Sequence, residues 1–554
     1  MVVQYGSVSL GALGASQRMW ETLTAPPPRI SGTTLEFTIV GARSGGYQPL
    51  RTGPGEPVIV RTELASASRH RAGLRSALAS LVQITDLHIT DVQNPLRFEY
   101  LDRYCGSGYR PQELLGTHGA TALVRRINSL HTGPLTGRPI DAVMTTGDNT
   151  DNQGGLELEW LLTILAGGVV RPSSGDPNAF EGVAGCGLRQ YWQPESEQPD
   201  DYKRHGFPVV PGLLAAATKP FGSPGLDVPW LLTMGNHDAA ALGKLEQQPP
   251  ITDWYTGHRK VFSAPTEAAL SLARRMSASV PPRGANHGAD QVREHFESIA
   301  RHGDTRTVSA DPRRSPFSRQ AYVEALRAPR FTGAGPIGHG YGKASDGDGS
   351  RLYYSYRLSE HVLAISLDTT NPAGGADGSL GAGQMRWLEQ QLNADQGSYV
   401  IVFSHHPSYR MANLAPDPRN PHESRHSGPQ LLALLHRHPR VLAWVNGHSH
   451  HNRITPRRHV DPHRSFWEIN TASHVDPPQQ ARVIEVARND NGTVSLFTTM
   501  IDADAPTRAS YTDLTPTGLA ALYRELAHNE LTPVNRHGTR ADRNTELLLV
   551  DPLT

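Results

Sequence analysis

The sequence predicts an α/β fold, because short apolar runs alternate with helical patterns and polar motifs follow the runs. Helical patterns at 119–130, 385–392 and 430–436 separate several of the apolar runs, as a βα alternation requires. In open α/β sheets the functional groups gather beyond the carboxyl ends of the strands, so we expect a site there. Six runs rich in Val, Ile and Leu have the character of strands buried on both faces: 81–84, 140–144, 228–232, 362–367, 399–403 and 441–445.

Smaller elements are expected on either side of this pattern. Residues 33–62 predict a small β prologue, followed by a helix over 63–79. Near the other end, strands at 466–471, 482–487 and 493–499 are expected to pair antiparallel, because the turn Asn489-Asp490-Asn491-Gly492 tolerates positive φ. A helix is predicted over 517–526, with a polar tail from about residue 529. The expected organisation is an N-terminal segment 1–79, a catalytic domain 80–504 and a C-terminal helix and tail 505–554.

Two long insertions interrupt the catalytic pattern. Residues 152–227 and 239–350 separate predicted strands, whereas connections in compact domains usually take about 2–6 residues. The second insertion includes a helical pattern at 266–277 and a Gly-rich run at 333–349, which lacks the Lys-Ser/Thr of a phosphate-binding P-loop. We interpret the Gly-rich run as a loop, and we expect the insertions to cap the site and to set its selectivity.

Composition excludes some classes of function. Lys plus Arg and Asp plus Glu number 53 each, so no global field favours nucleic acid or an anionic membrane. No apolar run approaches the roughly 20 residues of a membrane helix. The two cysteines, Cys105 and Cys186, match no zinc-binding spacing, and both a disulfide and two free thiols stay open.

The N-terminus carries an incomplete export signal. Residues 8–15 are apolar and small, but no Lys or Arg precedes them, so the charged region of a signal peptide is missing. The compartment therefore stays open: cytoplasmic, or exported if the true start lies upstream.

Five polar motifs, each directly after an apolar run, hold the residues that two metal ions need. Carboxylate, imidazole and amide groups without a thiolate suit Mn, Fe or Zn. Two such ions about 3.5–4 Å apart acidify a bound water and neutralise the phosphoryl oxygens of an ester. The motifs are Asp86-Leu87-His88, Gly147-Asp148-Asn149-Thr150-Asp151, Gly235-Asn236-His237-Asp238, His405-His406-Pro407 and Gly447-His448-Ser449-His450.

This ordered series resembles the motifs of the calcineurin-like metallophosphoesterase superfamily, over roughly residues 80–500 less the insertions. The resemblance implies a four-layer α/β/β/α sandwich of two mixed sheets, with a binuclear metal centre at the carboxyl ends of the strands. It also implies the ligands, carried over by motif position. Asp86, His88 and His450 would hold one metal, Asn236, His405 and His448 the other, and Asp148 would bridge them.

The resemblance further implies a hydrolase in which a metal-bridging hydroxide attacks phosphorus in line. His237 follows the ligand Asn236, so we expect it to act as an acid or to stabilise the transition state. In related phosphatases the residue at the position of Asp151 pairs with this histidine. Purple acid phosphatases carry a tyrosine ligand at that position, so Asp151 disfavours the tyrosinate-iron subclass.

The predicted substrate is a small phosphomonoester or phosphodiester. One alternative is a non-catalytic metal-binding scaffold on the same fold, although no ligand position is lost here. A nuclease is the second alternative, and the balanced charge argues against it. Among the other polar residues, His406 could touch substrate or support a ligand, and Tyr104, Arg110 and Arg410 could reach a phosphate, although a structural role is favoured for these three. Asp91 and Asn149 are interpreted as supporting groups, and Asp461-Pro462-His463 follows no predicted strand.

Overall fold

The computed structural model describes residues 29–42, 45–67, 75–104, 108–240, 243–244, 249–276, 289–342, 351–394, 397–532 and 534–554. The export-signal prediction at 8–15, the pairing of Cys105 and residues 343–349 of the Gly-rich run lie outside these residues. Among the described residues, no helix combines the length and the apolar character of a membrane span.

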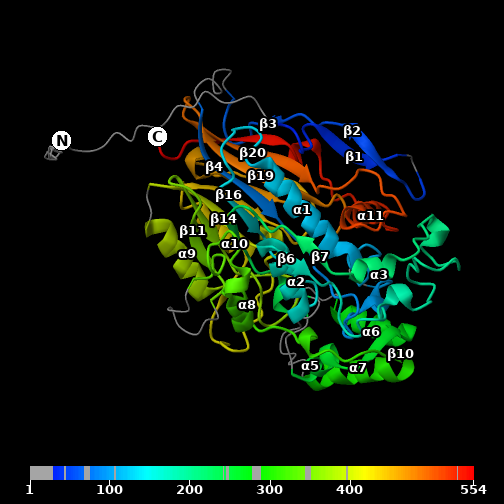
Figure 1. Cartoon of the computed structure of the whole chain (residues 1–554). Coiled ribbons are helices and arrows are strands. Elements are labelled where there is room, and N and C mark those ends of the chain that lie inside the picture. The colour runs from blue at the N-terminus through cyan, green and yellow to red at the C-terminus, as the bar shows by residue number, and fades with distance from the viewer. Residues whose placement is uncertain are drawn as a thin grey trace, which may run out of the picture.

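Two mixed sheets form the centre of the molecule (Figure 1). In the first sheet, β4, β5 and β8 run parallel, while β19 and β20 pair antiparallel beside them. Its strand order is β3 (Ile59–Arg61), β21 (Thr545–Val550), β20 (Thr493–Asp502), β19 (Gln480–Arg488), β4 (Ser76–Ile84), β5 (Ala142–Thr145) and β8 (Trp230–Leu231).

The second sheet contains four parallel strands with one antiparallel strand at each edge. Each predicted apolar run overlaps a buried strand of one sheet or the other, so the predicted pair of mixed sheets is confirmed. The order is β11 (Tyr354–Arg357), β12 (Val362–Ser366), β14 (Tyr399–Phe403), β16 (Val441–Asn446), β18 (Phe466–Asn470) and β17 (Arg453–Arg457).

Helices cover the outer faces and complete four layers. Apolar side chains of α1 (Gly116–Leu130) and α2 (Gly155–Ala166) join the core of the first sheet, and α11 (Pro516–His528) packs beside α1. On the other side, α9 (Ala382–Ala394) and α10 (Gly428–Leu435) bury leucines against β14 and β16. The two sheets contact each other directly, since Gln83 Nε2 donates to the Asn446 carbonyl at 3.0 Å.

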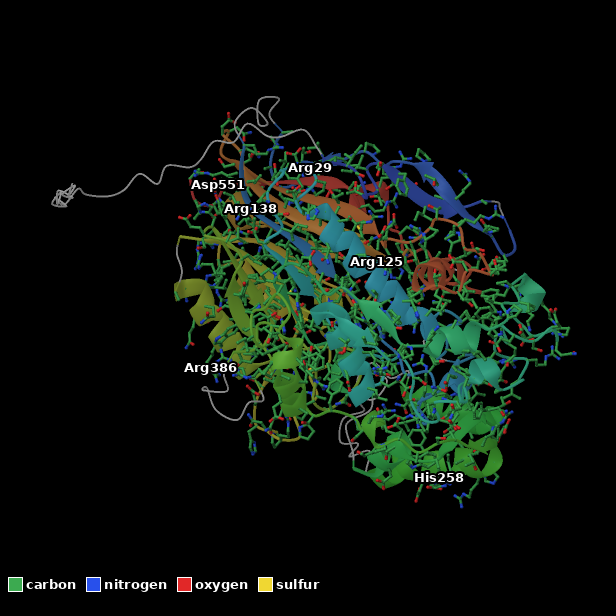
Figure 2. All side chains as sticks on the ribbon, in the orientation of Figure 1. Arg29, Arg125, Arg138, His258, Arg386 and Asp551 are labelled. Atoms are coloured by element: carbon green, nitrogen blue, oxygen red, sulfur yellow. The ribbon has the colours of Figure 1, made fainter. Side chains whose placement is uncertain are left out.

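The insertions are folded rather than open loops. The part of the second insertion from α5 to β10 forms a lobe at the edge of the molecule, where His258 lies far from Asp551 (Figure 2), whereas α8 packs into the main core. The predicted helix at 266–277 is confirmed as α6. The first insertion contains α2, β6 (Gly168–Val170), α3 (Leu213–Thr218) and β7 (Phe221–Ser223); the second contains α5 (Pro249–Thr256), β9 (Arg259–Ser263), α6 (Thr266–Met276), α7 (Ala289–His302), β10 (Asp304–Thr307) and α8 (Arg319–Leu326).

A buried ion pair connects the second insertion to the catalytic core. Lys260 Nζ lies 2.8 Å from Glu99 Oε1, and neither side chain has solvent exposure. The same ammonium donates to the Asn94 carbonyl at 2.8 Å. Because breaking a fully buried pair by removing one partner costs about 3–5 kcal/mol, this contact fixes the insertion to the loop that follows the first motif.

Two predictions for the ends of the chain need correction. The helix predicted over 63–79 is wrong in the residues that the structure describes, because 63–67 contain no helix and 76–79 begin β4, whose pairing with β19 overrides helical propensity. Residues 68–74 of the prediction lie outside the described residues. The polar tail predicted from residue 529 contains β21, which buries Leu547, Leu548 and Leu549 between β20 and β3. Terminal strands thus enter the same sheet as the catalytic strands, and the predicted domain boundaries stay a prediction.

The remaining elements are short. The predicted β prologue contains the hairpin of β1 and β2, and the predicted helix over 517–526 lies within α11. The α-helices and β-strands not named above are β1 (Phe37–Gly41), β2 (Leu50–Pro54), α4 (Asn236–Ala239), β13 (Leu380–Gly381) and β15 (Arg425–His426).

Candidate metal centre

The five motifs meet at the carboxyl ends of β4, β5, β8, β14 and β16. Backbone hydrogen bonds join the first two motifs, since Asp86 N donates to the Gly147 carbonyl at 3.0 Å and His88 N to the Asp148 carbonyl at 2.9 Å. Sharp turns after the strands direct the side chains along the sheet edge. Five of the predicted ligands have positive φ, a conformation that non-glycine residues adopt mainly where function or packing requires it: Asp86 (51°), His88 (44°), Asp148 (48°), His448 (67°) and His450 (56°).

The first half of the centre contains Asp86, His88 and His450. His450 Nε2 lies 3.3 Å from Asp86 Oδ1, and His88 Nε2 lies 3.9 Å from the same oxygen. The two imidazole Nε2 atoms are 3.3 Å apart. One carboxylate and two imidazoles thus point at one small volume.

The second half contains Asn236, His405 and His448. Asn236 Oδ1 lies 2.9 Å from His405 Nε2 and 3.1 Å from His448 Nδ1, and these two ring nitrogens are 3.1 Å apart. Asp148 lies between the halves, because its Oδ2 is 3.2 Å from His405 Nε2 and 3.6 Å from His88 Nε2.

These spacings fit metal ions. Two donors bonded at right angles to one ion, each at about 2.1 Å, are about 3.0 Å apart. Most donor separations in both halves lie close to that value. The trios Asp86, His88, His450 and Asp86, Asp148, His405 each lie within a 4.8 Å span. The donor set contains carboxylate, amide and imidazole groups and no thiolate, which suits Mn, Fe or Zn.

Three of the histidines have their second ring nitrogen held by the protein, as metal-ligating histidines usually do. His88 Nδ1 lies 2.7 Å from Asp151 Oδ1, and His405 Nδ1 lies 2.8 Å from the Thr146 carbonyl. His450 Nδ1 lies 2.6 Å from Asp476 Oδ2. Each contact fixes the orientation of the ring and leaves Nε2 facing the centre.

Asp476 was not predicted as a site residue from the sequence. It follows β18 by six residues, and β18 runs parallel to β16, so its carboxyl end opens on the same sheet edge. The run at 466–471 was expected to be antiparallel, which hid this relation. If the run at 466–471 had been predicted as a further parallel strand, the polar residues that follow it, including Asp476, would have been candidates for the site.

A buried arginine fixes the predicted partner of His237. Arg97, 1% exposed, forms ion pairs with both Asp151 and Glu113, and neither arginine nor glutamate belongs to a motif. The pairing leaves Asp151 Oδ1 directed at His88. That oxygen is also 3.4 Å from His237 Nδ1, which lies 2.8 Å from the Asp151 backbone carbonyl. Asp151 therefore orients two rings, and its contacts favour a supporting role over a ligand role.

The charges of the centre favour cations. Burial raises the pKa of the Asp148 carboxyl, but His405 and His237 outweigh burial and hold that pKa well below its usual range. Burial also raises the pKa of Asp151, and Arg97 and His237 reverse the shift. Burial lowers the pKa of His237, whereas Asp148 and Asp151 raise it above its usual value. The carboxylates thus remain ionised, and His237 is favoured as an imidazolium.

The other predicted polar residues lie beside the centre or away from it. Both ring nitrogens of His406 are occupied, by Thr369 Oγ1 at 2.8 Å and by the Ala376 carbonyl at 3.0 Å, so it supplies no free donor. Arg110 is buried and pairs with Asp476. Arg410 Nε lies 3.3 Å from His448 Nε2, at the partly exposed edge.

Two predicted supporting residues differ in what they contact. Asn149 Nδ2 donates a hydrogen bond to Oδ2 of the motif residue Asp238 at 2.9 Å, which joins the second and third motifs. Asp91 instead accepts from Ser174 in the first insertion. Tyr104 packs against the core of the second insertion, and Asp461 caps a surface 3₁₀ turn.

Part of the chain is similar to proteins of a known family. A family model described as calcineurin-like phosphoesterase matches residues 322–452, which contain the fourth and fifth motifs. Glycerophosphodiester phosphodiesterase GpdQ from Enterobacter lignolyticus (strain SCF1) is 30% identical over 103 residues, or 19% of this chain. The match spans 36% of that relative, about a third of its length.

Solved structures were compared as well. A dimetal phosphatase from Danio rerio has 12% identity and a TM-score of 0.34, covering 77% of this chain and 100% of that chain. PhoD has 9% identity and a TM-score of 0.30, covering 81% of this chain and 68% of that chain. The chain is thus similar to calcineurin-like phosphoesterases over the region of its fourth and fifth motifs, and this match, together with the donor clusters at one sheet edge, supports the predicted superfamily.

Proposed function

We propose that the protein is a metal-dependent hydrolase of phosphoric esters. The observation that carries this proposal is the pair of adjoining donor clusters that share Asp148. Two divalent or trivalent ions held there would supply an activated nucleophile at neutral pH and positive charge on the phosphoryl oxygens. The curated relative is named a phosphodiesterase, so phosphodiesters are the first substrates to test.

The chain's own residues divide into two groups of ligands. Asp86, His88 and His450 would hold one ion, and Asn236, His405 and His448 the other. Asp148 faces both groups and would bridge them. Because Asp151, Asp476 and the Thr146 carbonyl hold the outer nitrogens of three ligand rings, little side-chain freedom is lost when the ions bind.

His237 would act on the substrate. Its Nδ1 is anchored to the Asp151 carbonyl, which leaves Nε2 to donate a hydrogen bond to a phosphoryl oxygen or a proton to the leaving oxygen. The ring packs edge-on against His88, with centroids 4.6 Å apart. Its side chain is 13% exposed, so it can reach a substrate while keeping the partners that favour its charged form.

A panel of substrates and metals tests the proposal. Bis(p-nitrophenyl) phosphate and p-nitrophenyl phosphate would be hydrolysed by protein loaded with Mn²⁺, Fe²⁺, Zn²⁺ or Mg²⁺. We expect metal-stimulated hydrolysis that EDTA removes and that His405→Ala lowers to background without unfolding the protein. Less than one bound metal per chain, with no hydrolysis across the panel, would favour the non-catalytic scaffold instead.

The same panel addresses the nuclease alternative. A nuclease needs cationic groups that track the phosphate backbone, and this chain has a formal net charge of zero. We therefore expect no binding of single- or double-stranded DNA at low salt. Tight DNA binding with metal-dependent cleavage would replace the small-molecule substrate by nucleic acid.

A further inference from the structure

The second insertion begins one residue after the third motif, and its first residues fold back onto that motif. Gly243 N donates to the Ala240 carbonyl at 2.8 Å, and Ala240 N donates to the Asn236 carbonyl at 3.0 Å. The Gly243 carbonyl in turn accepts from Asn236 Nδ2 at 3.1 Å. Gly243 and Lys244, here called the strap, thus lie against a predicted metal ligand.

The strap passes so close to the site that only glycine fits. Gly243 has a φ of 64°, in the left-handed region that glycine adopts without strain. A Cβ atom at this position would lie 2.2 Å from Asn236 Nδ2, 2.4 Å from His237 Cδ2 and 2.8 Å from His237 Nε2. Any side chain would therefore displace the amide, the imidazole or both.

The far end of the strap is fixed as well. Gly375 N donates to the Lys244 carbonyl at 2.9 Å. The loop that carries Gly375 also supplies Asp377, whose Oδ1 lies 2.9 Å from Arg410 Nη2. The strap is therefore attached to a loop that already contacts the second half of the centre, and it cannot shift without moving that loop.

The hydrogen bond between Asn236 and Gly243 determines which end of the Asn236 amide faces the metal centre. The amide oxygen and amide nitrogen of Asn236 occupy similar volumes, and only the oxygen can bind a metal ion. The Gly243 carbonyl accepts a hydrogen bond and cannot donate one, so it selects the rotamer with Nδ2 toward the strap. That choice leaves Oδ1 facing His405 and His448, at 2.9 Å and 3.1 Å.

We propose that Gly243 is a positioning residue, through which the second insertion orients Asn236 for metal binding and flanks the His237 ring. The inference rests on the proposed function, because it takes Asn236 as a ligand. It assigns the insertion a part in building the second half of the centre, in addition to the capping role expected from its length. The first half contains no contact with the strap among its described ligands.

Two glycine variants with matched backbone strain test the proposal. Gly243→Ala adds both a positive-φ penalty and the clash with Asn236. Gly492→Ala adds a similar penalty, since its φ is 74°, but its Cβ would have nothing within 4 Å. Each metal-free variant would be titrated with Mn²⁺ by calorimetry, after thermal unfolding has shown that it is folded.

We expect Gly243→Ala to bind one Mn²⁺ with the affinity of the unaltered protein, whereas the Kd of the second rises at least tenfold. Gly492→Ala should bind both ions normally. Two ions bound by Gly243→Ala with unchanged Kd values would overturn the proposal. If the unaltered protein binds less than one Mn²⁺, the proposed function itself fails, so the two failures are distinguishable.

Hydrogen exchange on the unaltered protein gives an answer even if Gly243→Ala does not fold. Mn²⁺ should slow exchange of the peptide that carries Gly243 and Lys244 at least tenfold relative to EDTA-treated protein, because a fixed Asn236 amide stabilises the strap. Equal exchange with and without Mn²⁺, in a protein that binds two ions, would contradict the coupling.

Discussion

Two groups of buried histidines behave in opposite ways. At the centre, burial lowers the pKa of His405 and His450, but Asp148 and Asp86 outweigh burial and raise both values to about 9. Away from it, burial lowers the pKa of His118 to about 3 and that of His474 to about 4. All four side chains are largely removed from solvent, and adjoining carboxylates account for the higher values at the centre.

The comparison shows how neighbouring carboxylates oppose the effect of burial on the pKa of a histidine. Imidazole alone is a common neutral core group. Within the centre, His88 and His448 crowd other histidines, and burial together with these neighbours lowers their pKa values. The carboxylates therefore supply the negative charge that attracts cations. His88 and His448 are favoured in the neutral form that offers a lone pair, whereas His405 and His450 must release a proton before they can bind a metal ion. Removing carboxylates one at a time is the direct way to test this division.

The largest effect is expected from the carboxylate shared by both halves. Asp148→Asn removes the charge that faces both His88 and His405. We expect kcat/KM for a chromogenic phosphodiester to fall at least about a thousandfold, because metal charge and nucleophile activation both depend on this group. Calorimetry should show weaker binding of both ions. Unchanged hydrolysis by a folded Asp148→Asn protein would refute the binuclear assignment.

Replacing His237, which we propose acts on the substrate and binds no metal, should separate chemistry from metal binding. His237→Gln keeps a polar side chain but removes the group that can be charged, so kcat should fall by about 10²–10⁴-fold, the usual contribution of a general acid. Metal content, measured by mass spectrometry, should stay that of the unaltered protein. Loss of one ion in this variant would instead make His237 a ligand.

A smaller effect on metal binding is expected from Asp476, whose carboxylate contacts the ligand His450 of the first half. Asp476→Asn removes the charge that holds His450 Nδ1, and such a change typically weakens metal binding by about 10–100-fold. Calorimetry should show this loss for one ion only. Weakening of both ions to the same degree would mean that Asp476 supports the fold and not one half of the centre.

The sequence predicted the parts of the site that lie next to strands. Apolar runs followed by polar motifs identified nine candidate groups, because a strand end determines where the next side chains go. The family resemblance then divided them into seven ligands and the pair His237 and Asp151. Contacts from distant segments were not predictable in this way. Arg97, Asp476 and Gly243 lie in loops or in an insertion, and only tertiary folding brings them to the centre.

The fold shows the same division between local and distant information. The helix prediction over 63–79 failed because local propensity favoured a helix, whereas pairing with β19, about 400 residues later in the chain, determined a strand. β21 was missed for a similar reason, since Leu547, Leu548 and Leu549 form too short a run to predict a strand without its partners. Long-range pairing supplied what the local pattern lacked.

The last prediction concerns a histidine outside the centre. His118 stacks on Phe221, with ring centroids 4.2 Å apart, and its pKa is lowered to about 3 by burial and by Arg125, which lies on the same helix (Figure 2). The unfolded chain, with a histidine pKa near 6.5, therefore binds more protons than the folded protein between pH 6.5 and 3. Stability is lost as the pH falls through this window, by about 1.4 kcal/mol per pH unit for this histidine.

His118→Phe removes this proton uptake and keeps a ring against Phe221. Urea unfolding of both proteins at pH 7 and pH 5 should show that the variant loses about 2 kcal/mol less on acidification than the unaltered protein. Each protein's own value at pH 7 is the reference, which cancels any change in packing caused by the larger ring. Equal losses would mean that His118 can be protonated in the folded state, and that burial without a carboxylate does not keep an imidazole neutral in this core.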